Sequence, residues 1–347
     1  MFVNNAWYVA AYADELTDKP LARRILNQPV VLFRSPEGTV AALEDRCCHR
    51  GAPLSYGALC AQGIECGYHG LIYDVQGRCV LVPGGHRIPP NARVRSYPVV
   101  EKDGFVWLWT GDPTLAQRIQ PMDYPWSHDP AWSERHDMYP IRSSYLMMVD
   151  NLMDLTHLGY VHGRTIGGTP SAHVEARMRV EKTPDGVRFV RWMLNSPPPP
   201  TYVKAGGFTG LVDRCQEFRF VAPSTVLQWT GAVDAGVGAY QPASPQVKFA
   251  FRLFHGMTPE TETSCFYFWS MALLSPDRQP WDELFNDVAA TFKEDQAIVE
   301  AQQARLSELP DPPLVEIHGD GATLQARALI ERLIAQERAQ PPTAAVG

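Results

Sequence analysis

The chain of 347 residues is 45% hydrophobic and carries a formal net charge of −7 at pH 7. This length can bury two cores, and an acidic chain without a basic run is a poor candidate for nucleic-acid binding. The sequence has no apolar run long enough to span a bilayer, no apparent signal peptide and no paired framework among its seven cysteines. We therefore expect a cytoplasmic protein that does not enter a membrane.

The first third of the chain has the alternating apolar pattern of short β-hairpins. Residues 30–33 and 40–43 flank a Pro-Glu-Gly turn signal, and residues 99–101 and 105–109 flank a Lys-Asp-Gly turn signal. The proline-containing stretch from residue 111 to 125 then predicts a domain boundary.

Two segments of this β-rich region each contain one cysteine and one histidine. Cys47 and His49 form a C-x-H pair, and Cys66 and His69 form a C-x-x-H pair after sixteen intervening residues. Two thiolates and two imidazoles from two hairpin tips are the ligand set of a Rieske-type [2Fe-2S] cluster, with the cysteines on one iron and the histidines on the other. A structural Cys2His2 zinc site is the alternative, but zinc fingers usually take both cysteines from a hairpin and both histidines from a helix.

The other five cysteines are not expected to bind the cluster. Cys48 lies between Cys47 and His49, and its consequence stays open. The remaining four are most simply buried small apolar residues, namely Cys60, Cys79, Cys215 and Cys265.

A second candidate site follows about a hundred residues later, in a segment that contains Asn151, Asp154, His157 and His162. On an unbroken helix, two histidines five residues apart point about 140° away from each other and cannot share a metal. We therefore predict that the helix loosens near Gly159. Two histidines and one carboxylate, with open positions opposite, form the facial triad of non-haem Fe(II) oxygenases.

Asp295 is the best candidate for the carboxylate ligand of this triad. It lies in a segment of helical apolar spacing and would face the core with Phe292 and Val299, where a carboxylate needs a cation to offset its desolvation. The alternative is an exposed acidic pair formed with Glu294.

Asp154 has a different predicted task. A carboxylate three residues before a metal-binding histidine can accept the second ring N–H of His157, and Asp154 could equally accept an N–H from the cluster ligand His69. It would then connect the two iron centres. Asn151, on the same predicted helix face, would line this junction, unless it is a capping or surface amide.

Several long strands are expected after this segment, separated by the proline run at residues 197–200 and a turn region at 231–238. Alternate residues from 247 to 253 are apolar and His255 falls on the same face, so its side chain should point inward. Arg252 lies on the opposite face and is expected to be a surface cation. Gln228 is a weaker inward-facing candidate.

Two helices, at about residues 281–306 and 322–337, are predicted to close the chain before a frayed tail that follows Gln340. The other histidines have no ligand spacing and are expected on the surface or in loops, namely His86, His128, His136, His173 and His318.

Together, the two motifs resemble the oxygenase (alpha) component of Rieske non-haem iron aromatic oxygenases. The resemblance runs from residues 5–10 through the cluster loops to Glu294 and Asp295, and it is greatest to the branch of vanillate and dicamba O-demethylases and toluenesulfonate methyl-monooxygenases. It implies an α+β fold, with an all-β Rieske [2Fe-2S] domain over residues 1–115. A helix-grip catalytic domain with a long antiparallel sheet and a mononuclear iron would follow over residues 116–347.

The resemblance also implies a function. The chain would be the terminal oxygenase of a multicomponent monooxygenase in aromatic compound catabolism, with a [2Fe-2S] cluster, mononuclear Fe(II) and O2 as co-substrate. It would hydroxylate a methyl or methoxy group of an aromatic acid and form a homotrimer. No dinucleotide-binding fingerprint is found, so NAD(P)H should act only through a separate flavin and iron-sulfur reductase. His255 and Gln228 are the candidate substrate contacts.

Three alternatives remain open at this point. A cis-dihydroxylating dioxygenase would have the same motifs. A Rieske-type electron carrier would need only about the first hundred residues, and a zinc-stabilised binding module would need no iron.

Overall fold

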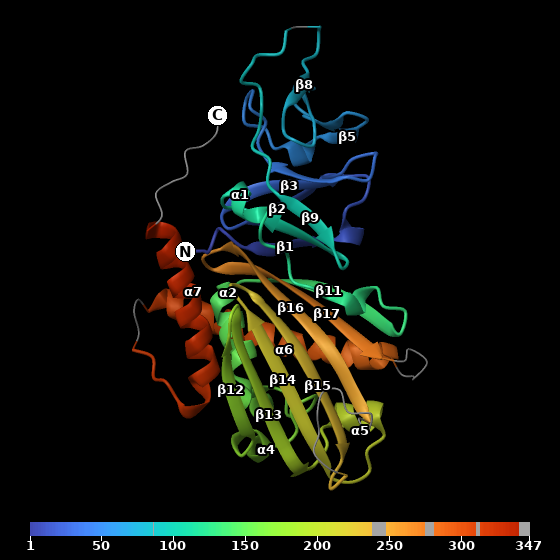
Figure 1. Cartoon of the computed structure of the whole chain (residues 1–347), viewed down its shortest axis with the longest axis vertical. Helices are drawn as coiled ribbons and strands as arrows, with labels where there is room; N and C mark the ends of the chain where they lie inside the picture. Colours follow the sequence, from blue (N-terminus) through green and yellow to red (C-terminus); the bar gives the residue numbers. More distant parts are fainter. Residues whose placement is uncertain (86, 238–247, 275–280, 310–312, 340–347) are drawn as a thin grey trace. The chain divides into compact units, whose positions relative to one another are not determined.

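A computed structural model describes most of the chain (Figure 1) and divides it into two compact units. The first contains Met1–Asp123, Thr258–Glu262 and the described residues from Gln336 onward, and the second contains Tyr124–Met257 and Thr263–Ala335. The boundary expected between residues 115 and 116 remains a prediction. The described residues are 1–85, 87–237, 248–274, 281–309 and 313–339.

The first unit is built from short antiparallel strands in three sheets. Two of its hairpins confirm the hairpins predicted around the Pro-Glu-Gly and Lys-Asp-Gly turns, namely β3 (Gln28–Arg34) with β4 (Val40–Glu44) and β9 (Val99–Lys102) with β10 (Phe105–Trp109). The sheets are β1 (Trp7–Tyr12), β10 (Phe105–Trp109) and β9 (Val99–Lys102); β2 (Leu21–Ile25), β3 (Gln28–Arg34) and β4 (Val40–Glu44); and β5 (Ala58–Cys60), β6 (Gly63–Glu65), β7 (Ile72–Tyr73) and β8 (Cys79–Leu81). The short helical segments are η1 (Ala13–Glu15), η2 (Leu54–Tyr56) and α1 (Pro113–Ala116).

The second unit contains a seven-stranded antiparallel sheet in the order β11-β17-β16-β15-β14-β13-β12, so the α+β fold with a long antiparallel sheet is confirmed. Contacts with the strands place three helices against the sheet (Figure 1), namely α2 (Tyr145–Met153), α4 (Pro170–Val174) and α6 (Trp281–Glu308). The strands are β11 (Trp132–Ile141), β12 (Arg177–Thr183), β13 (Gly186–Ser196), β14 (Val212–Val221), β15 (Thr225–Asp234), β16 (Phe249–Thr261) and β17 (Ser264–Leu274). The helical segments are η3 (Pro125–Ser127), α2 (Tyr145–Met153), η4 (Leu155–His157), α3 (Leu158–Val161), α4 (Pro170–Val174), α5 (Pro200–Gly206), α6 (Trp281–Glu308), η5 (His318–Asp320) and α7 (Gly321–Ala339).

Alternation along the strands separates two faces of this sheet. Phe251, Leu253 and His255 are buried on one face of β16, which confirms that His255 points inward. A small apolar cluster that includes Cys215 and Trp229 covers part of the other face. Residues 238–247 and the tail after Gln340, about which the sequence made predictions, lie outside the described residues.

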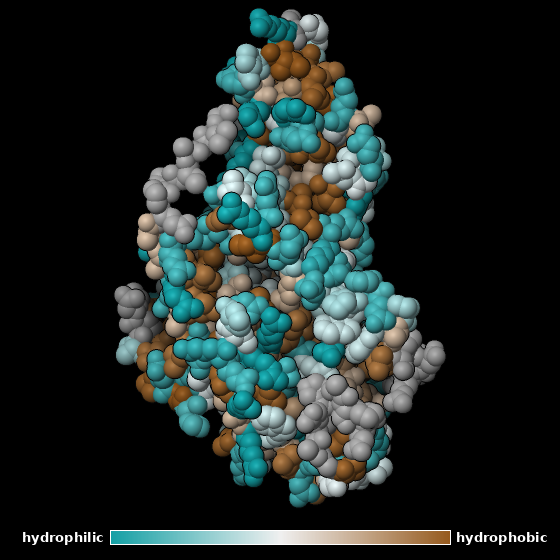
Figure 2. Space-filling model, viewed as in Figure 1, coloured by the Kyte–Doolittle hydropathy of each residue, from teal (hydrophilic) through white to brown (hydrophobic). Residues whose placement is uncertain are grey.

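The helices predicted at residues 281–306 and 322–337 are confirmed by α6 and α7. No helix among the described residues has both the length and the apolar character needed to cross a bilayer. Hydrophilic residues dominate the visible surface, and hydrophobic residues form separate patches on it (Figure 2).

The helix break predicted at Gly159 is wrong, because the chain breaks at Asp154 instead. Asp154 has extended angles, φ −120° and ψ 104°, and separates α2 from η4. Its carboxylate accepts a hydrogen bond from the Thr156 N–H at 2.9 Å, which caps the new turn. Gly159 lies inside α3, where a Cβ atom would come within 2.5 Å of the Pro170 Cα. The glycine therefore permits close packing between α3 and α4.

Candidate metal centres

The two cysteine-histidine loops of the first unit have the same backbone turn. In each, the cysteine N–H donates to the carbonyl five residues later, and a glycine with positive φ donates its N–H back to the cysteine carbonyl. Glycine tolerates this left-handed conformation without strain. The four bonds are Cys47 to Ala52 at 2.8 Å, Gly51 to Cys47 at 2.9 Å, Cys66 to Leu71 at 2.8 Å and Gly70 to Cys66 at 2.9 Å.

This turn places the sulfurs and the imidazoles in different environments. Cys47 and Cys66 are buried, whereas His49 and His69 are exposed, with ring centroids 4.6 Å apart. An inner pair of sulfur ligands and an outer pair of nitrogen ligands match the two unlike irons of a Rieske cluster.

These four residues do not fit the zinc alternative. Within the part of the chain that the structure describes, His157, His162 and Asp295 form the group of His, Cys, Asp or Glu side chains that could together hold one ion. The loop residues are not part of such a set, although a tetrahedral zinc requires its four ligands around a single ion.

Tyr73, which the sequence analysis did not single out, contacts the cluster loop. Its hydroxyl oxygen lies 3.1 Å from Cys47 Sγ and 3.2 Å from Cys48 Sγ. Burial raises the pKa of Tyr73 far above its ordinary value, so the hydroxyl keeps its proton and can donate to a thiolate. Cys48 thus shares a hydrogen-bonding partner with an expected cluster ligand.

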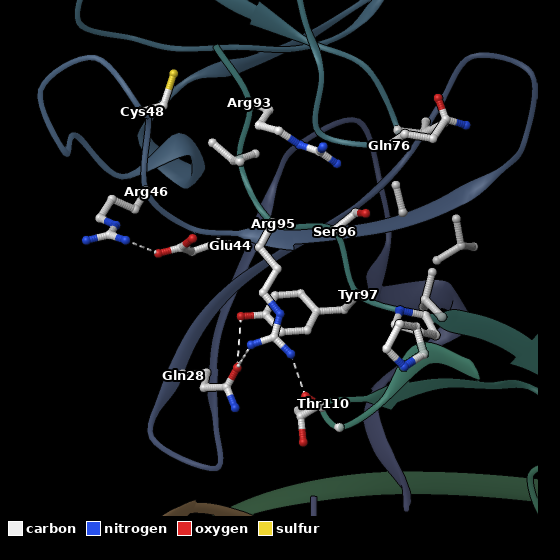
Figure 3. Close-up of a pocket in the computed structure, with 18 of the residues that line it drawn as sticks. Gln28, Glu44, Arg46, Cys48, Gln76, Arg93, Arg95, Ser96, Tyr97 and Thr110 are labelled. Carbon is white, nitrogen blue, oxygen red and sulfur yellow. Dashed lines mark hydrogen bonds and ion pairs between the residues drawn. The ribbon is translucent and has the colours of Figure 1, made fainter. Parts of the chain in front are cut away.

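A groove with a volume of about 1570 Å³ borders Cys47 and Cys48 (Figure 3). Two of its charged side chains contact neighbours in the same unit. Arg95 donates to Gln28 Oε1 at 2.9 Å and to the Thr110 carbonyl at 2.5 Å, and Arg46 pairs with Glu44 at 2.7 Å. The groove wall therefore carries charged side chains among apolar ones.

The second candidate centre brings together His157, His162 and Asp295, as the sequence predicted. Their ligand atoms all lie within 4.8 Å of one another. The Nε2 atoms of His157 and His162 are 3.4 and 3.0 Å from Asp295 Oδ1. Two ligands bound at about 2.1 Å and roughly at right angles lie about 3.0 Å apart, so this donor set fits one iron ion.

Electrostatics in this centre favour an ionised Asp295. Burial opposes its charge, yet hydrogen bonds and charges from His157 and His162 hold the pKa of Asp295 well below its usual range. For His162, burial acts against protonation, while Asp295 and Glu294 raise its pKa. A metal ion would replace that proton as the positive charge between the groups.

The other ring nitrogen of each histidine also has a partner. His157 Nδ1 lies 2.6 Å from the backbone carbonyl of Asp154, and His162 Nδ1 lies 2.7 Å from Glu294 Oε2. Both partners are acceptors, so each Nδ1 carries a hydrogen, and a metal ion that displaces the proton between Nε2 and Asp295 would meet the lone pair of each Nε2.

Two sequence expectations change here. The Asp154 carboxylate was expected to accept from His157, but the acceptor is its backbone carbonyl, because the carboxylate caps Thr156. Glu294 was considered only as part of an exposed acidic pair, and instead it orients His162. The sequence signal for Glu294 was its position directly before Asp295, but only the tertiary packing reveals its partner.

Asn151 lies at the iron site. Its side-chain amide donates to Asp295 Oδ1 at 3.0 Å, from the last turn of α2. This contact does not match the alternative of a capping or surface amide.

The two substrate candidates, His255 and Gln228, contact each other. His255 Nε2 lies 3.0 Å from Gln228 Oε1, and His255 Nδ1 lies 2.7 Å from the Tyr267 hydroxyl. Burial lowers the pKa of His255 to about 3, so the ring is neutral, donating to the amide and accepting from the phenol. Whether either residue touches a substrate remains a prediction.

Three further expectations about side-chain exposure need correction. His173, in α4, is buried, and its Nε2 lies 2.8 Å from the Gly167 carbonyl. Arg252 is only half-exposed and stacks over the Trp126 ring, with 4.2 Å from Cζ to the centroid. Cys60 is half-buried, in contrast to Cys79, Cys215 and Cys265. His128 and His318 are exposed, His136 is half-buried and His86 lies outside the described residues.

Comparisons with known proteins match both parts of the chain. Residues 6–98 match the Rieske [2Fe-2S] domain, and residues 141–336 match the vanillate O-demethylase oxygenase C-terminal domain. A putative toluene-4-sulfonate monooxygenase system iron-sulfur subunit from Comamonas testosteroni is 38% identical, with 97% of this chain and 98% of that protein covered. A vanillate O-demethylase oxygenase subunit from Pseudomonas sp. (strain HR199 / DSM 7063) is 40% identical, with 97% and 96% covered.

A solved structure gives the same result. Dicamba monooxygenase bound to 3,6-dichlorosalicylic acid superposes with a TM-score of 0.90 at 34% identity, over 98% of this chain and 99% of that one. The chain therefore belongs to the family of Rieske [2Fe-2S] oxygenases that have a vanillate O-demethylase oxygenase C-terminal domain.

Proposed function

We propose that this chain is the terminal oxygenase component of a multicomponent Rieske monooxygenase that hydroxylates a methyl or methoxy substituent of an aromatic acid. The observation that carries the proposal is the convergence of His157, His162 and Asp295, with both Nδ1 atoms already bonded to acceptors. The relatives support the reaction class, since they are named for toluene-4-sulfonate, vanillate and dicamba.

In this proposal, Cys47, His49, Cys66 and His69 hold the [2Fe-2S] cluster within the domain assigned to residues 1–115. His157, His162 and Asp295 hold the mononuclear iron of a catalytic domain assigned to residues 116–347. When bound, the two iron centres supply one-electron transfer and the activation of O2 for hydroxylation.

The remaining residues of the site position these ligands. The Asp154 carbonyl and the Glu294 carboxylate fix the ring orientations of His157 and His162, and Asn151 donates to Asp295. The Asp154 carboxylate would accept an N–H from a cluster histidine, which gives electrons a hydrogen-bonded route. His255 and Gln228 would contact the substrate.

The electron donor in this proposal is a separate flavin and iron-sulfur reductase, in line with relatives that are named oxygenase components. The enzyme would work in the cytoplasm as a homotrimer in which the cluster of one subunit supplies the iron of its neighbour. Such an arrangement would give the Asp154 carboxylate its second partner.

The first test is composition and spectroscopy of anaerobically purified protein. We expect about three irons and two sulfides per chain, and a low-average-g EPR signal after dithionite reduction. Zinc without sulfide would overturn the proposal, and two irons alone would favour an electron carrier.

The second test is product analysis with a surrogate reductase and a panel of methylated and methoxylated aryl acids. Formaldehyde or a benzylic alcohol supports monooxygenation. A cis-diol would instead establish a ring-hydroxylating dioxygenase.

A further inference from the structure

Two arginines on the helix-facing side of the large sheet are buried without an acidic partner. Arg191 on β13 is 3% exposed and Arg214 on β14 is 1% exposed. No Asp or Glu within the described part of the chain forms an ion pair with either one. By contrast, Arg188 points to the opposite face of β13 and pairs with Glu217 at 2.8 Å. The Asp154 carboxylate acts on Arg191 only through its charge and forms no ion pair with it, and burying two cations side by side is costly, so their presence requires an explanation.

Backbone carbonyls accept only some of the hydrogen bonds that the two guanidinium groups can donate. Arg191 Nη2 donates to the His173 carbonyl at 2.9 Å, and Arg214 donates to the Ile166 and Gly167 carbonyls, each at 3.1 Å. Arg191 Nη1 and Arg214 Nε are buried without an acceptor. Carbonyl dipoles do not neutralise the charge, and two donors remain to be used.

These arginines lie close to the iron-ligand loop. Gly167, whose carbonyl accepts from Arg214, donates its own N–H to the carbonyl of the iron ligand His162 at 2.9 Å. The loop between α3 and α4 therefore connects the arginine pair directly to the candidate metal centre.

The strand register places Arg191 and Arg214 on the same sheet face as Gln228, with Arg191 one row and two strands away and Arg214 two rows and one strand away. Arg191 lies opposite Gln216, whose Oε1 is also buried without a hydrogen bond, and Phe218 lies opposite Gln228 on the next row of the same face. One row is about 7 Å along the strands, and two strands are about 10 Å across the sheet.

We propose that Arg191 and Arg214 bind the oxyanion group of the aromatic substrate, a carboxylate or sulfonate, while its methyl or methoxy group lies toward Asp295. This assignment rests on the proposed function. Guanidinium groups suit it because they present paired donors to planar or tetrahedral oxyanions. The Tyr202 ring lies 4.7 Å from the Arg214 Cζ and limits the direction from which an anion can approach.

The charge state of the pair is consistent with this role. Burial and the neighbouring charge of Arg214 lower the pKa of Arg191 to about 10, although the Asp154 carboxylate acts in the opposite direction, so Arg191 remains a cation at neutral pH. A bound oxyanion would relieve the repulsion between them.

Anaerobic holoenzyme titrated by calorimetry tests the inference, with 4-methylbenzenesulfonate and 4-methylbenzoate compared with their neutral amides. We expect each anion that binds to do so at least ~10-fold more tightly than its amide. Arg191→Gln and Arg214→Gln should each weaken anion binding by ~10-fold or more and leave amide binding unchanged. Arg188→Gln removes the same charge from the other face of β13 and should leave the binding of both anions and amides unchanged.

Competition on the unaltered protein provides a second measurement that does not depend on variants. Sodium sulfate should displace the aryl anions but not the amides. The inference is overturned if neither anion binds, if anions and amides bind equally, or if the variants weaken both to the same extent. Turnover of neutral arenes alone would also overturn it, together with the aromatic-acid part of the proposed function, while leaving the monooxygenase reaction intact. Anion selectivity in a protein that hydroxylates no arene would instead overturn only the function.

Discussion

The two candidate metal centres position their ligands in different ways. The cluster ligands come from one repeated turn, in which Cys47 and Cys66 make the same backbone hydrogen bonds and each loop has its own positive-φ glycine. The iron ligands come from separate helical segments that meet only when the second unit has folded. His157 ends η4, His162 follows α3 and Asp295 lies in α6.

This difference has consequences for stability and for access. The cluster histidines are exposed, which suits a centre that exchanges electrons with other groups, while His162 and Asp295 are buried among partners that restrict their movement. The first centre depends on local turns, and the second depends on the packing of α2, α3 and α6. The following predictions test how independent the two centres are.

The largest expected effect follows from Asp295→Ala. Removing the shared carboxylate leaves His157 and His162 without an anionic ligand, so iron content should fall from about three to about two per chain while the Rieske EPR signal persists. Asp287→Ala on the same helix removes a surface partner of Lys204 and should change neither the iron content nor the EPR signal. Loss of the cluster signal in the Asp295 variant would show that the centres are not independent.

Asp154→Asn should separate the centres electronically without disturbing their ligands. Asparagine still caps Thr156 and keeps the backbone carbonyl for His157, but it lacks the carboxylate charge. We expect both metals to be retained and turnover to fall by ~10–100-fold, measured as product formed per cluster. Asp150→Asn, which alters an ion pair with Arg327, serves as the control. Normal coupled turnover would argue against the bridging role.

Glu294→Gln should act on the mononuclear iron alone. The amide oxygen accepts more weakly from His162 Nδ1 than the carboxylate does, so iron affinity should fall by ~10-fold. Chelator competition followed by iron analysis measures this change. Glu300 lies farther along α6 and pairs with Arg142, so Glu300→Gln should leave the iron affinity unchanged. An unchanged affinity in the Glu294 variant would remove its positioning role.

Stability of the second unit should depend on pH in the acidic range. Burial lowers the pKa of His255 to about 3 and that of His173 to about 4, from 6.5 in the unfolded chain. The unfolded state therefore binds more protons, so stability is complete above pH 6.5 and is lost as the pH falls toward 4. Each group contributes up to about 1.4 kcal/mol per pH unit. Urea unfolding at pH 5 and 7 checks this, and His173→Gln should reduce the slope.

Gly159→Ala should have the smallest effect that can be measured with confidence. Its Cβ would meet the Pro170 backbone, and the resulting separation of α3 from α4 should cost about 1–3 kcal/mol of unfolding free energy. Gly210 has open space around it, so Gly210→Ala should change stability by less than about 0.5 kcal/mol. Equal thermal stabilities of the two variants would contradict the packing role of Gly159.

The contrast between the centres also explains what the sequence could predict. The cluster loops could be predicted because their ligands, glycines and turns lie within one short segment. Asp295 could be predicted because helical spacing placed it beside Phe292 and Val299, which are buried in α6 as expected. These inferences used only local periodicity and ligand chemistry.

The rest depended on contacts between segments far apart in the sequence. The position of the helix break is set by the Asp154 cap and by the packing of Gly159 against Pro170. The partner of Glu294 and the burial of His173 beside Arg191 follow from how α6 and β13 meet the helical segments. The spacing of residues in the sequence does not reveal such contacts between distant segments.

Helix α6 contacts the same imidazole on both of its nitrogens, since Glu294 approaches Nδ1 of His162 and Asp295 approaches Nε2. The ring cannot turn over without breaking both contacts, and neither acid can withdraw without moving the helix that carries the other. The residence time of the metal should therefore follow the opening of this helix rather than the motion of a single side chain. Amide hydrogen exchange around residue 294 and the rate of iron release would then change together when the helix is destabilised.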